Sequence, residues 1–290
     1  MNGILSVILG ACERGLLFSL LVLSIYITSR IMKVENLALE GSFSLGAAFG
    51  ALALGWEINP FFGLILAAGG GALVGGITAA IHCGLGLSML ISGIVVTSAL
   101  FSVVLMLAGS NISLIGMQTC FSVLDMLGSC KYFVATGACA VFLYGILNHV
   151  IHRSSFGMIL RATGSNPALV AALGRNVWLY KILALALSNG LTGFVGAFYV
   201  QYVGYFSIWM NVGILVVALT GLMIAELFSF RWALIHLVAG SVVYQVLLAV
   251  VYECDIDPQW SKLLTAALVV GVAALKIINS HDLKLKGSGL

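Results

Sequence analysis

The histidines of this chain offer one spacing at which two side chains could bind a metal ion together. His149 and His152 lie three residues apart, so on a helix both rings would point from the same face. A zinc site needs further ligands, and the sequence places no third ligand near this pair. Packing at the end of an apolar segment is the simpler interpretation of both rings, as it is for His82 and His236.

The six cysteines show no C-x-x-C spacing, which argues against a metal or redox motif. Cys120 and Cys130 fall in one expected loop, where they could form a disulfide or serve as small apolar residues. The sequence also has no G-x-x-x-x-G-K-[ST] phosphate loop, no H-E-x-x-H zinc motif and no G-x-S-x-G or G-x-G-D site. It therefore predicts neither an enzyme nor a bound cofactor, and any ATP would have to be hydrolysed by another subunit.

Two carboxylates, Glu40 and Glu226, stand near the ends of long apolar segments. A charge at the centre of a membrane costs about 2.5–3.5 kcal/mol on insertion scales, so such residues are often functional. Glu40 with Ser42 could belong to a polar cluster that lines or gates a path, or it could be a paired or snorkelling carboxylate. The uncharged polar residues Thr97 and Asn189 could face the same path or form hydrogen bonds between helices.

The composition requires lipid as the solvent for most of the surface. Hydrophobic residues make up 61% of the 290 residues and charged residues only 8%, and the mean hydropathy is +1.15, whereas soluble domains carry about 25% charged residues. The net charge of +3 is too small to indicate nucleic-acid binding. Glycine occurs 34 times, including Gly46-x-x-x-Gly50 and Gly71-x-x-x-Gly75, a spacing that lets helices approach closely in membranes.

Runs of roughly 20 apolar residues predict an all-α, polytopic membrane protein with a single transmembrane domain over residues 1–290. About nine spans are expected, with eight to ten as the range. They lie at residues 15–32, 37–55, 60–81, 87–107, 132–151, 179–202, 211–228, 232–252 and 261–279. Residues 1–13 could form an interfacial helix or extend the first span, and the loop 108–131 could hold a small helix at the membrane surface.

The distribution of lysine and arginine predicts the orientation, because cytoplasmic loops are enriched in both. Alternating nine spans with a cytoplasmic C-terminus places ten of these residues inside: Arg30, Lys33, Arg153, Arg161, Arg175, Lys181, Arg231, Lys276, Lys284 and Lys286. Three lie outside: Arg14, Lys131 and Lys262. The bias predicts an external N-terminus, and a different number of spans would reverse that end.

The loop 152–178, expected on the cytoplasmic side, encodes a short helix. Asn166 can serve as the N-cap, and Pro167 suits the first helical position. Residues 168–173 are mostly good helix formers, and Gly174 can adopt the left-handed conformation that ends a helix. A helix of about two turns is unstable alone, so its apolar residues must be buried. Leu169, Val170 and Leu173 would pack on the protein's own spans or the membrane surface, or would be received by a separate cytoplasmic partner.

Seven segments, in the same order along the chain, carry a likeness to one known family. They are Leu37-Ala-Leu-Glu-Gly-Ser-Phe-Ser-Leu-Gly-Ala-Ala, Ile91-Ser-Gly-Ile-Val-Val-Thr-Ser-Ala-Leu, Asn111-Ile-Ser-Leu, Phe156-Gly-Met-Ile-Leu-Arg-Ala-Thr-Gly-Ser-Asn, Ala171-Ala-Leu-Gly-Arg-Asn, Lys181-Ile-Leu-Ala-Leu-Ala-Leu-Ser-Asn-Gly-Leu and Lys262-Leu-Leu-Thr-Ala-Ala-Leu-Val-Val. Together they resemble ABC-transporter permeases of the branched-chain amino acid and ribose type. Within that type the chain looks most like permeases that work with a tryptophan- or tyrosine-type substrate-binding lipoprotein.

The resemblance implies that residues 161–174 are a coupling helix that docks on a cytoplasmic ATP-binding subunit. The residues expected to couple are Arg161, Gly164, Asn166, Pro167, Leu169, Leu173 and Gly174. It also implies a homodimer in a bacterial cytoplasmic membrane, surrounded by lipid, and an extracytoplasmic binding protein that delivers a small solute such as an amino acid. The sequence departs from the family where Gly174 is followed by Arg175-Asn176-Val177-Trp178, which affects the details of docking.

The alternative to an ABC permease is an ion-coupled secondary transporter or channel that acts alone. Carriers driven by protons or sodium usually place carboxylates deeper in the membrane than the positions expected for Glu40 and Glu226. A membrane scaffold without transport activity is a third class, which would show no effect of any solute.

Overall fold

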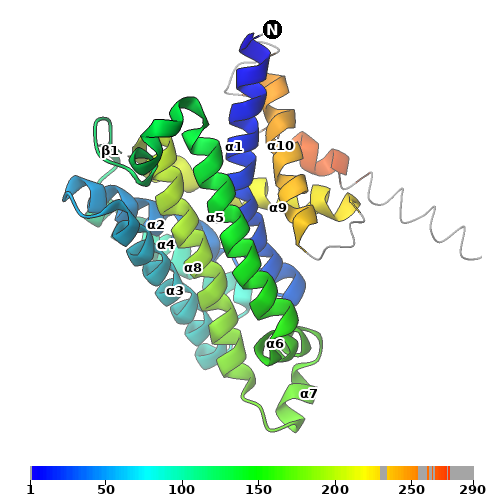
Figure 1. Ribbon diagram of the computed structural model, residues 1–290. Helices are drawn as coiled ribbons and strands as arrows, with labels where there is room; N and C mark the ends of the chain where they lie inside the picture. The colour runs from blue at the N-terminus through cyan, green and yellow to red at the C-terminus, as the bar shows by residue number, and fades with distance from the viewer. Residues whose placement is uncertain are drawn as a thin grey trace, which may run out of the picture.

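The computed structural model describes residues 2–228, 234–253, 260, 263, 265–272 and 274. They form an all-α protein whose helices are joined by short loops (Figure 1). The elements are α1 (Asn2–Ile25), the π-helical turn η1 (Tyr26–Ile31), α2 (Ala38–Gly55), α3 (Pro60–Leu85), α4 (Met89–Ala108), strand β1 (Asn111–Ser113), the 3₁₀ segment η2 (Cys120–Cys130), α5 (Lys131–Asn148), the π-helical turn η3 (His149–Arg153), α6 (Ser155–Ser165), α7 (Pro167–Ala172), α8 (Val177–Val203), strand β2 (Tyr205–Ser207), the 3₁₀ turn η4 (Ile208–Asn211), α9 (Ile214–Leu227) and α10 (Ile235–Glu253).

Seven helices among the described residues are long and apolar enough to cross a membrane. They are Ser6–Ile31, Ala38–Gly55, Pro60–Leu85, Met89–Ala108, Lys131–Arg153, Val177–Val203 and Ile208–Leu227, and Ile235–Val251 is a shorter apolar helix. The polytopic all-α fold is thus confirmed, whereas the predicted number of nine spans is not. The expected span 261–279 is described only at residues 263, 265–272 and 274, and Arg231, Lys262 and the basic residues 276, 284 and 286 lie outside the described residues.

The first span begins earlier than the sequence indicated. The apolar helix runs from Ser6 to Ile31, before the expected start at residue 15, which agrees with the interpretation that the preceding stretch extends the first span. The adjacent charges of Glu13 and Arg14 do not end the helix, since apolar residues precede and follow them. Both charged residues therefore lie within this helix, and the external position expected for Arg14 stays a prediction.

Three helices, α2, α3 and α8, pack through glycine. A methyl group added at Gly46 would overlap the backbone of Gly193, and one at Gly71 or Gly75 would overlap carbonyl oxygens of α8. At Gly50 an added Cβ would lie 2.8 Å from the Cα atom of Ala197. All four glycines of the two predicted G-x-x-x-G motifs thus face α8, and small residues give the close helix approach that packing in lipid requires.

Hydroxyl groups join α8 to α1 within this core. The Ser188 hydroxyl donates to the backbone carbonyl of Ser24 at 2.8 Å, and Thr192 Oγ1 donates to Ser24 Oγ at 2.8 Å. All three side chains are fully buried. Each buried hydroxyl thus has a partner, as a site without access to water demands.

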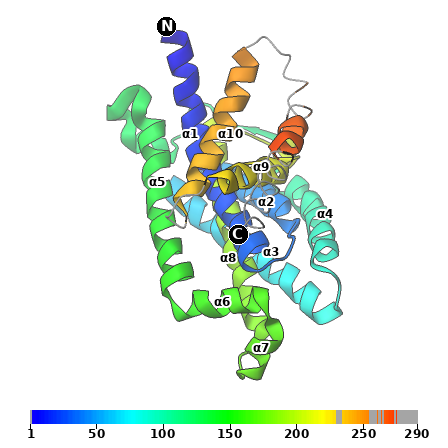
Figure 2. The ribbon, with the colours of Figure 1, turned by 90° about the vertical axis from the view of Figure 1, so that its right-hand side faces the viewer.

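On the other side of α1, α10 runs alongside it and also contacts α9 (Figure 2). An added Cβ at Gly15 would lie 2.7 Å from the Cα atom of Val242, and Ser241 Oγ donates to the Gly15 carbonyl at 2.8 Å. By contrast, Leu73 of α3, Met106 of α4 and Val141 of α5 are exposed. The exposed apolar side chains of these three helices form the surface expected to face lipid.

The two ends of the molecule differ in structure. The N-terminus of α1 lies at one end, and α6 and α7 lie at the opposite end in both views (Figures 1 and 2). After α4 the chain forms β1, which pairs antiparallel with β2 in the register Asn111 to Ser207 and Ser113 to Tyr205. The small helix expected within loop 108–131 is observed as η2.

Candidate coupling segment and polar sites

The α6–α7 segment consists of two helices that are each capped by a side chain at the N-terminus. Ser154 Oγ accepts a hydrogen bond from the backbone N–H of Gly157 at 3.1 Å, which starts α6. Asn166 lies between the helices, and its Oδ1 accepts from the Leu169 N–H at 3.1 Å, which starts α7. These caps satisfy N–H groups that a helix leaves free in its first turn.

The local structure of α7 is the one predicted from the sequence. Asn166 is the N-cap, Pro167 occupies the first turn and the helix ends after Ala172. Gly174 adopts a φ of +72°, a conformation that favours glycine, and its N–H donates to the Ala171 carbonyl at 2.9 Å. The Asn-Pro start and glycine stop are therefore confirmed as helix boundaries.

The three apolar side chains of α7 do not share one environment. Val170 is only 1% exposed, so it packs against the protein. Leu169 and Leu173 are 52% and 70% exposed. One side of α7 is thus held by the chain itself, while two leucines on a capped and protruding helix remain available to another surface.

The preceding helix α6 holds this segment against the spans. A methyl group added at Gly164 would overlap the Ile31 carbonyl oxygen at the end of η1, and Leu160 is fully buried. The Arg161 guanidinium contacts His152 Nδ1 at 3.0 Å. Of the residues predicted to couple, Gly164 and Arg161 therefore pack on or bond to the chain's own residues, whereas more than half of the Leu169 and Leu173 side chains is exposed.

The polar residues expected to line a path make contacts between helices. Ser42 Oγ of α2 donates to Asn189 Oδ1 of α8 at 2.8 Å, and both side chains are fully buried. Thr97 Oγ1 of α4 donates to the Leu37 carbonyl at 2.9 Å, just before α2 begins. These bonds correspond to the alternative that the sequence had left open for uncharged polar residues, and a role in a path stays a prediction.

Glu40 interacts with the beginning of another helix. Its carboxylate lies near the backbone N–H groups of Leu215 and Gly213, where α9 starts. Gly213 has a φ of +86°, which favours glycine at this turn. The negative charge lies at the positive end of a helix dipole, beside N–H groups that a helix leaves free in its first turn. Glu40 therefore interacts favourably with the start of α9.

Glu226 is paired, as one interpretation of the sequence proposed. Its carboxylate forms a salt bridge with Arg30 of η1, which joins the end of α9 to the end of the first span. A cavity of about 690 Å³ lies beside this pair and is lined partly by Arg30, Lys33 and Asn36.

Three of the histidines, His82, His152 and His236, have partners among the described residues. His152 contacts Arg161, and His82 contacts both the Leu87 carbonyl at 2.7 Å and Lys181 Nζ at 3.1 Å. The His236 ring lies edge-on to Tyr26. Within the described part of the chain, no group of three histidine, cysteine, aspartate or glutamate side chains is arranged to hold a metal ion.

The two loop cysteines do not form a disulfide. Cys120 is a buried free thiol and Cys130 is an exposed one. Burial raises the pKa of Cys120 to about 12, because the thiolate would lose its hydration. The Cys120 backbone N–H donates to Gln201 Oε1 at 2.8 Å, so η2 is attached to the end of α8.

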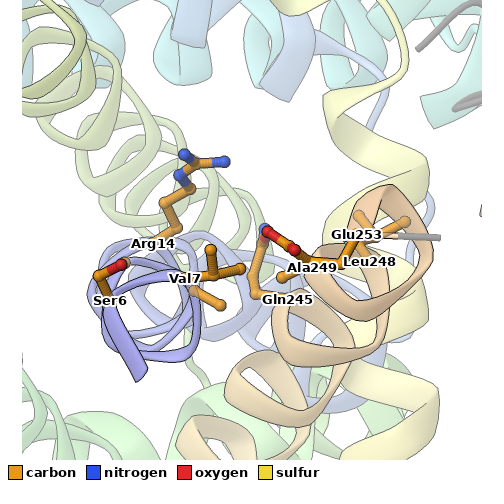
Figure 3. A pocket seen from close by; sticks show the side chains of 9 residues that line it. Ser6, Val7, Arg14, Gln245, Leu248, Ala249 and Glu253 are labelled. Atoms are coloured by element: carbon orange, nitrogen blue, oxygen red, sulfur yellow. The ribbon is translucent and has the colours of Figure 1, made fainter. Parts of the chain in front are cut away.

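Two cavities at the end opposite α7 were not anticipated from the sequence. One, of about 370 Å³, lies between α1 and α10, where Arg14 extends from α1 and Gln245 and Glu253 extend from α10 (Figure 3). The other, of about 570 Å³, is lined by Glu13, Arg14, Tyr132, Tyr199, Tyr202, Val203 and Tyr205. The available signal was a pair of adjacent charged residues, Glu13 and Arg14, flanked on both sides by apolar residues. It was missed because the predicted span began only after this pair.

Comparison with known proteins agrees with this architecture. Residues 7–273 match the family described as the permease component of branched-chain amino acid transport systems. The chain belongs to this permease family. It is therefore a transport permease component and a multi-pass membrane protein, as the resemblance and the seven long apolar helices indicate.

Relatives cover nearly the whole chain. A tyrosine transport system permease protein of Clostridioides difficile (strain R20291) is 29% identical over 96% of this chain and 93% of its own length. The uncharacterized protein RP368 of Rickettsia prowazekii (strain Madrid E) is 28% identical over 96% of this chain and all of its own length. No solved structure matches the chain.

Proposed function

We propose that this permease is the membrane-spanning subunit of a binding-protein-dependent ABC importer, and that α7 couples it to a separate ATP-binding subunit. The observation that carries the proposal is the pair of exposed leucines, Leu169 and Leu173, on a capped helix at one end of the molecule. A helix of six residues is not stable by itself, and a groove in a partner subunit would bury these two side chains.

The position of α7 in the chain suits a coupling role. Only residues 173–176 separate α7 from α8, whose middle packs closely on α2 and α3. On the other side, α6 contacts the end of the first span at Gly164. A displacement of α7 by the partner would therefore act directly on the core and on the first span. ATP binding and solute binding would each favour one arrangement of the spans, which is the requirement for coupling between distant sites.

The solute in this proposal is an amino acid or a chemically similar small molecule. The relative from Clostridioides difficile is a permease of a tyrosine transport system, which supports this class. Two copies of the permease would form the path at their interface, as two-fold symmetry favours. In this arrangement α7 and the C-terminus face the cytoplasm of a bacterium, and an external binding protein delivers the solute to the opposite end.

The experiment that tests coupling is co-purification of the tagged permease from its native membrane in mild detergent. We expect the native protein to recover an ATP-binding subunit and the double variant Leu169→Asp/Leu173→Asp to lose it. Ile115→Asp is a matched control, because Ile115 is exposed and precedes η2, away from α7. Equal thermal unfolding midpoints of the three proteins would show that loss of the subunit is not caused by misfolding.

Failure to recover an ATP-binding subunit with well-folded native protein would contradict the proposal. Transport driven by an ion gradient would then have to be measured in vesicles that contain the permease alone. An effect of Ile115→Asp as large as that of the α7 variant would contradict the assignment of the docking surface.

A further inference from the structure

The second of the two cavities at the end opposite α7, which we call the tyrosine cavity, combines two charged side chains with aromatic rings. Glu13 and Arg14 come from α1, Tyr132 from the start of α5, and Tyr199, Tyr202 and Tyr205 from the end of α8 and from β2. Its volume of about 570 Å³ lies within the range of roughly 300–1,000 Å³ for small-molecule sites.

The charges of the tyrosine cavity lie within the first long apolar helix. Glu13 is seven residues from the start of the helix Ser6–Ile31, which is roughly 10 Å along its axis. Glu13 is buried, whereas Arg14 is exposed to the cavities. Charged residues at such positions are costly and usually serve a ligand path or a proton path.

Neither Glu13 nor Arg14 forms a salt bridge with another residue that the structure describes. The salt bridges among the described residues join Arg30 to Glu226 and Lys131 to Asp125. Within the cavity, the Tyr202 hydroxyl donates to Glu13 Oε2 at 3.3 Å, and the Arg14 guanidinium lies near the same hydroxyl. The hydroxyl thus orients the carboxylate while leaving most of the hydrogen-bonding capacity of both charged groups available.

The aromatic rings of the cavity are fixed by packing. The centroids of the Tyr132 and Tyr202 rings lie 5.5 Å apart at 86°, and Phe121 packs behind Tyr132 at 5.0 Å. Tyr199 packs on Phe18 at 5.4 Å on its other side. Because packing already holds these rings, ligand binding costs little of their conformational entropy, and they can contact a flat apolar group.

From this arrangement we infer that the tyrosine cavity is a solute site within the permease, and that its ligand is a zwitterionic amino acid with an aromatic side chain. The Arg14 guanidinium binds the ligand carboxylate, since its planar fork matches a carboxylate. Glu13 accepts from the ligand ammonium group, and the tyrosine rings contact the ligand ring. The inference rests on the proposed transport function, and it places the site at the end of α8 opposite α7, where an external binding protein would release its solute.

The test uses the full-length permease alone in lipid nanodiscs, without any ATP-binding subunit. Saturation-transfer NMR with L-phenylalanine measures binding, with phenethylamine, 3-phenylpropionate and L-alanine as probes that lack the carboxylate, the ammonium group and the ring. We expect saturable binding of L-phenylalanine and about tenfold weaker binding of each probe, because each lacks one charged or aromatic contact.

The variants test which residue binds which group of the ligand. In Arg14→Gln, the affinities for L-phenylalanine and phenethylamine should converge, and in Glu13→Gln those for L-phenylalanine and 3-phenylpropionate should converge. A residue with only a structural role would weaken all ligands equally and would leave these ratios unchanged. Arg175→Gln and Glu57→Gln are matched controls at exposed positions outside the cavity, and they should keep the native ratios.

Absence of saturable binding to the native permease would overturn the inference, as would ratios that the two cavity variants leave unchanged. Because no ATP-binding subunit takes part, the result is independent of the co-purification experiment. Recovery of the subunit together with absence of binding would reject the tyrosine cavity alone. Binding without recovery of the subunit would reject the coupling mechanism and leave the site in place.

Discussion

The middle of α8 and the two ends of α8 use side chains in opposite ways. In the middle, glycines bring α8 against α2 and α3, and polar groups such as Ser188 and Asn189 are buried and paired. Just before the first residue of α8, the α7 segment presents exposed leucines. At the last turns of α8, tyrosines and charged residues line a cavity. The middle of α8 thus has no space for larger side chains, whereas its ends carry the groups that another molecule can contact.

This difference indicates where the permease can move and where it cannot. Close backbone contacts without side chains between them transmit displacement, since they cannot be compressed or repacked. A helix with a tight middle therefore connects events at one end to events at the other. The predictions below test whether the middle is as intolerant, and the ends as tolerant, as this comparison requires.

The largest effect is expected in the middle, at Gly75. A methyl group there would overlap the Leu185 carbonyl oxygen of α8, whereas one at the neighbouring Gly76 would meet no atom within 4 Å. We expect Gly75→Ala to lower the free energy of unfolding by about 3 kcal/mol, because the two helices must separate. Gly76→Ala should change it by less than about 1 kcal/mol.

Thermal unfolding of both glycine variants in the same detergent measures this difference. Equal midpoints for Gly75→Ala and Gly76→Ala would mean that the close contact of α3 with α8 is not maintained in the membrane.

An intermediate effect is expected at the capping residue of α7. Asn166→Ala removes the acceptor for the Leu169 N–H and should destabilise α7 by about 1 kcal/mol. Because the spans do not depend on this cap, the global unfolding midpoint should stay unchanged while recovery of the ATP-binding subunit falls. Asn166→Asp, which keeps an acceptor at the N-cap, is the control and should restore recovery. A global loss of stability would show that α7 belongs to the core.

A smaller effect is expected from the bond between α2 and α8. Ser42→Ala removes the donor to Asn189 Oδ1, and hydrogen bonds between membrane helices contribute about 0.6 kcal/mol on average. Ser19→Ala is the control, because the Ser19 hydroxyl donates to the Leu16 carbonyl of its own helix, and the bond from Tyr144 of α5 goes to the Ser19 backbone carbonyl, which the substitution keeps. If Ser42→Ala abolished transport without lowering stability, Ser42 would belong to the solute path and not only to the helix contact.

The smallest effect is expected from adding a reducing agent, which acts on thiols at the end opposite α7. Because Cys120 and Cys130 are free thiols, a reducing agent should leave the unfolding midpoint unchanged. Cys120 should also resist alkylation near neutral pH, since its pKa of about 12 leaves very little thiolate. Its reaction rate should rise about tenfold for each pH unit up to that value. Rapid labelling of a variant that keeps only Cys120 at pH 8 would show that η2 opens away from α8.

Local signals predicted those parts of the permease that depend on few neighbouring residues. Asn166, Pro167 and Gly174 specify the start and the stop of α7 through caps and backbone conformation alone. The two G-x-x-x-G motifs correctly indicated close helix contacts. By contrast, the extent of the first span was underestimated, because Glu13 and Arg14 read as a boundary when only their neighbours in sequence are considered.

The sequence by itself determined that this chain is an all-α membrane protein, because composition and apolar run length depend on each residue's own transfer free energy. Its likeness to the permease family was carried by the seven collinear segments and not by composition. The tertiary structure alone decided which polar groups meet. It paired Ser42 with Asn189 and Glu40 with the start of α9, and it brought Glu13 and Arg14 to tyrosines almost 190 residues further along the chain. Such partners are chosen by the packing of whole helices, which no local pattern encodes.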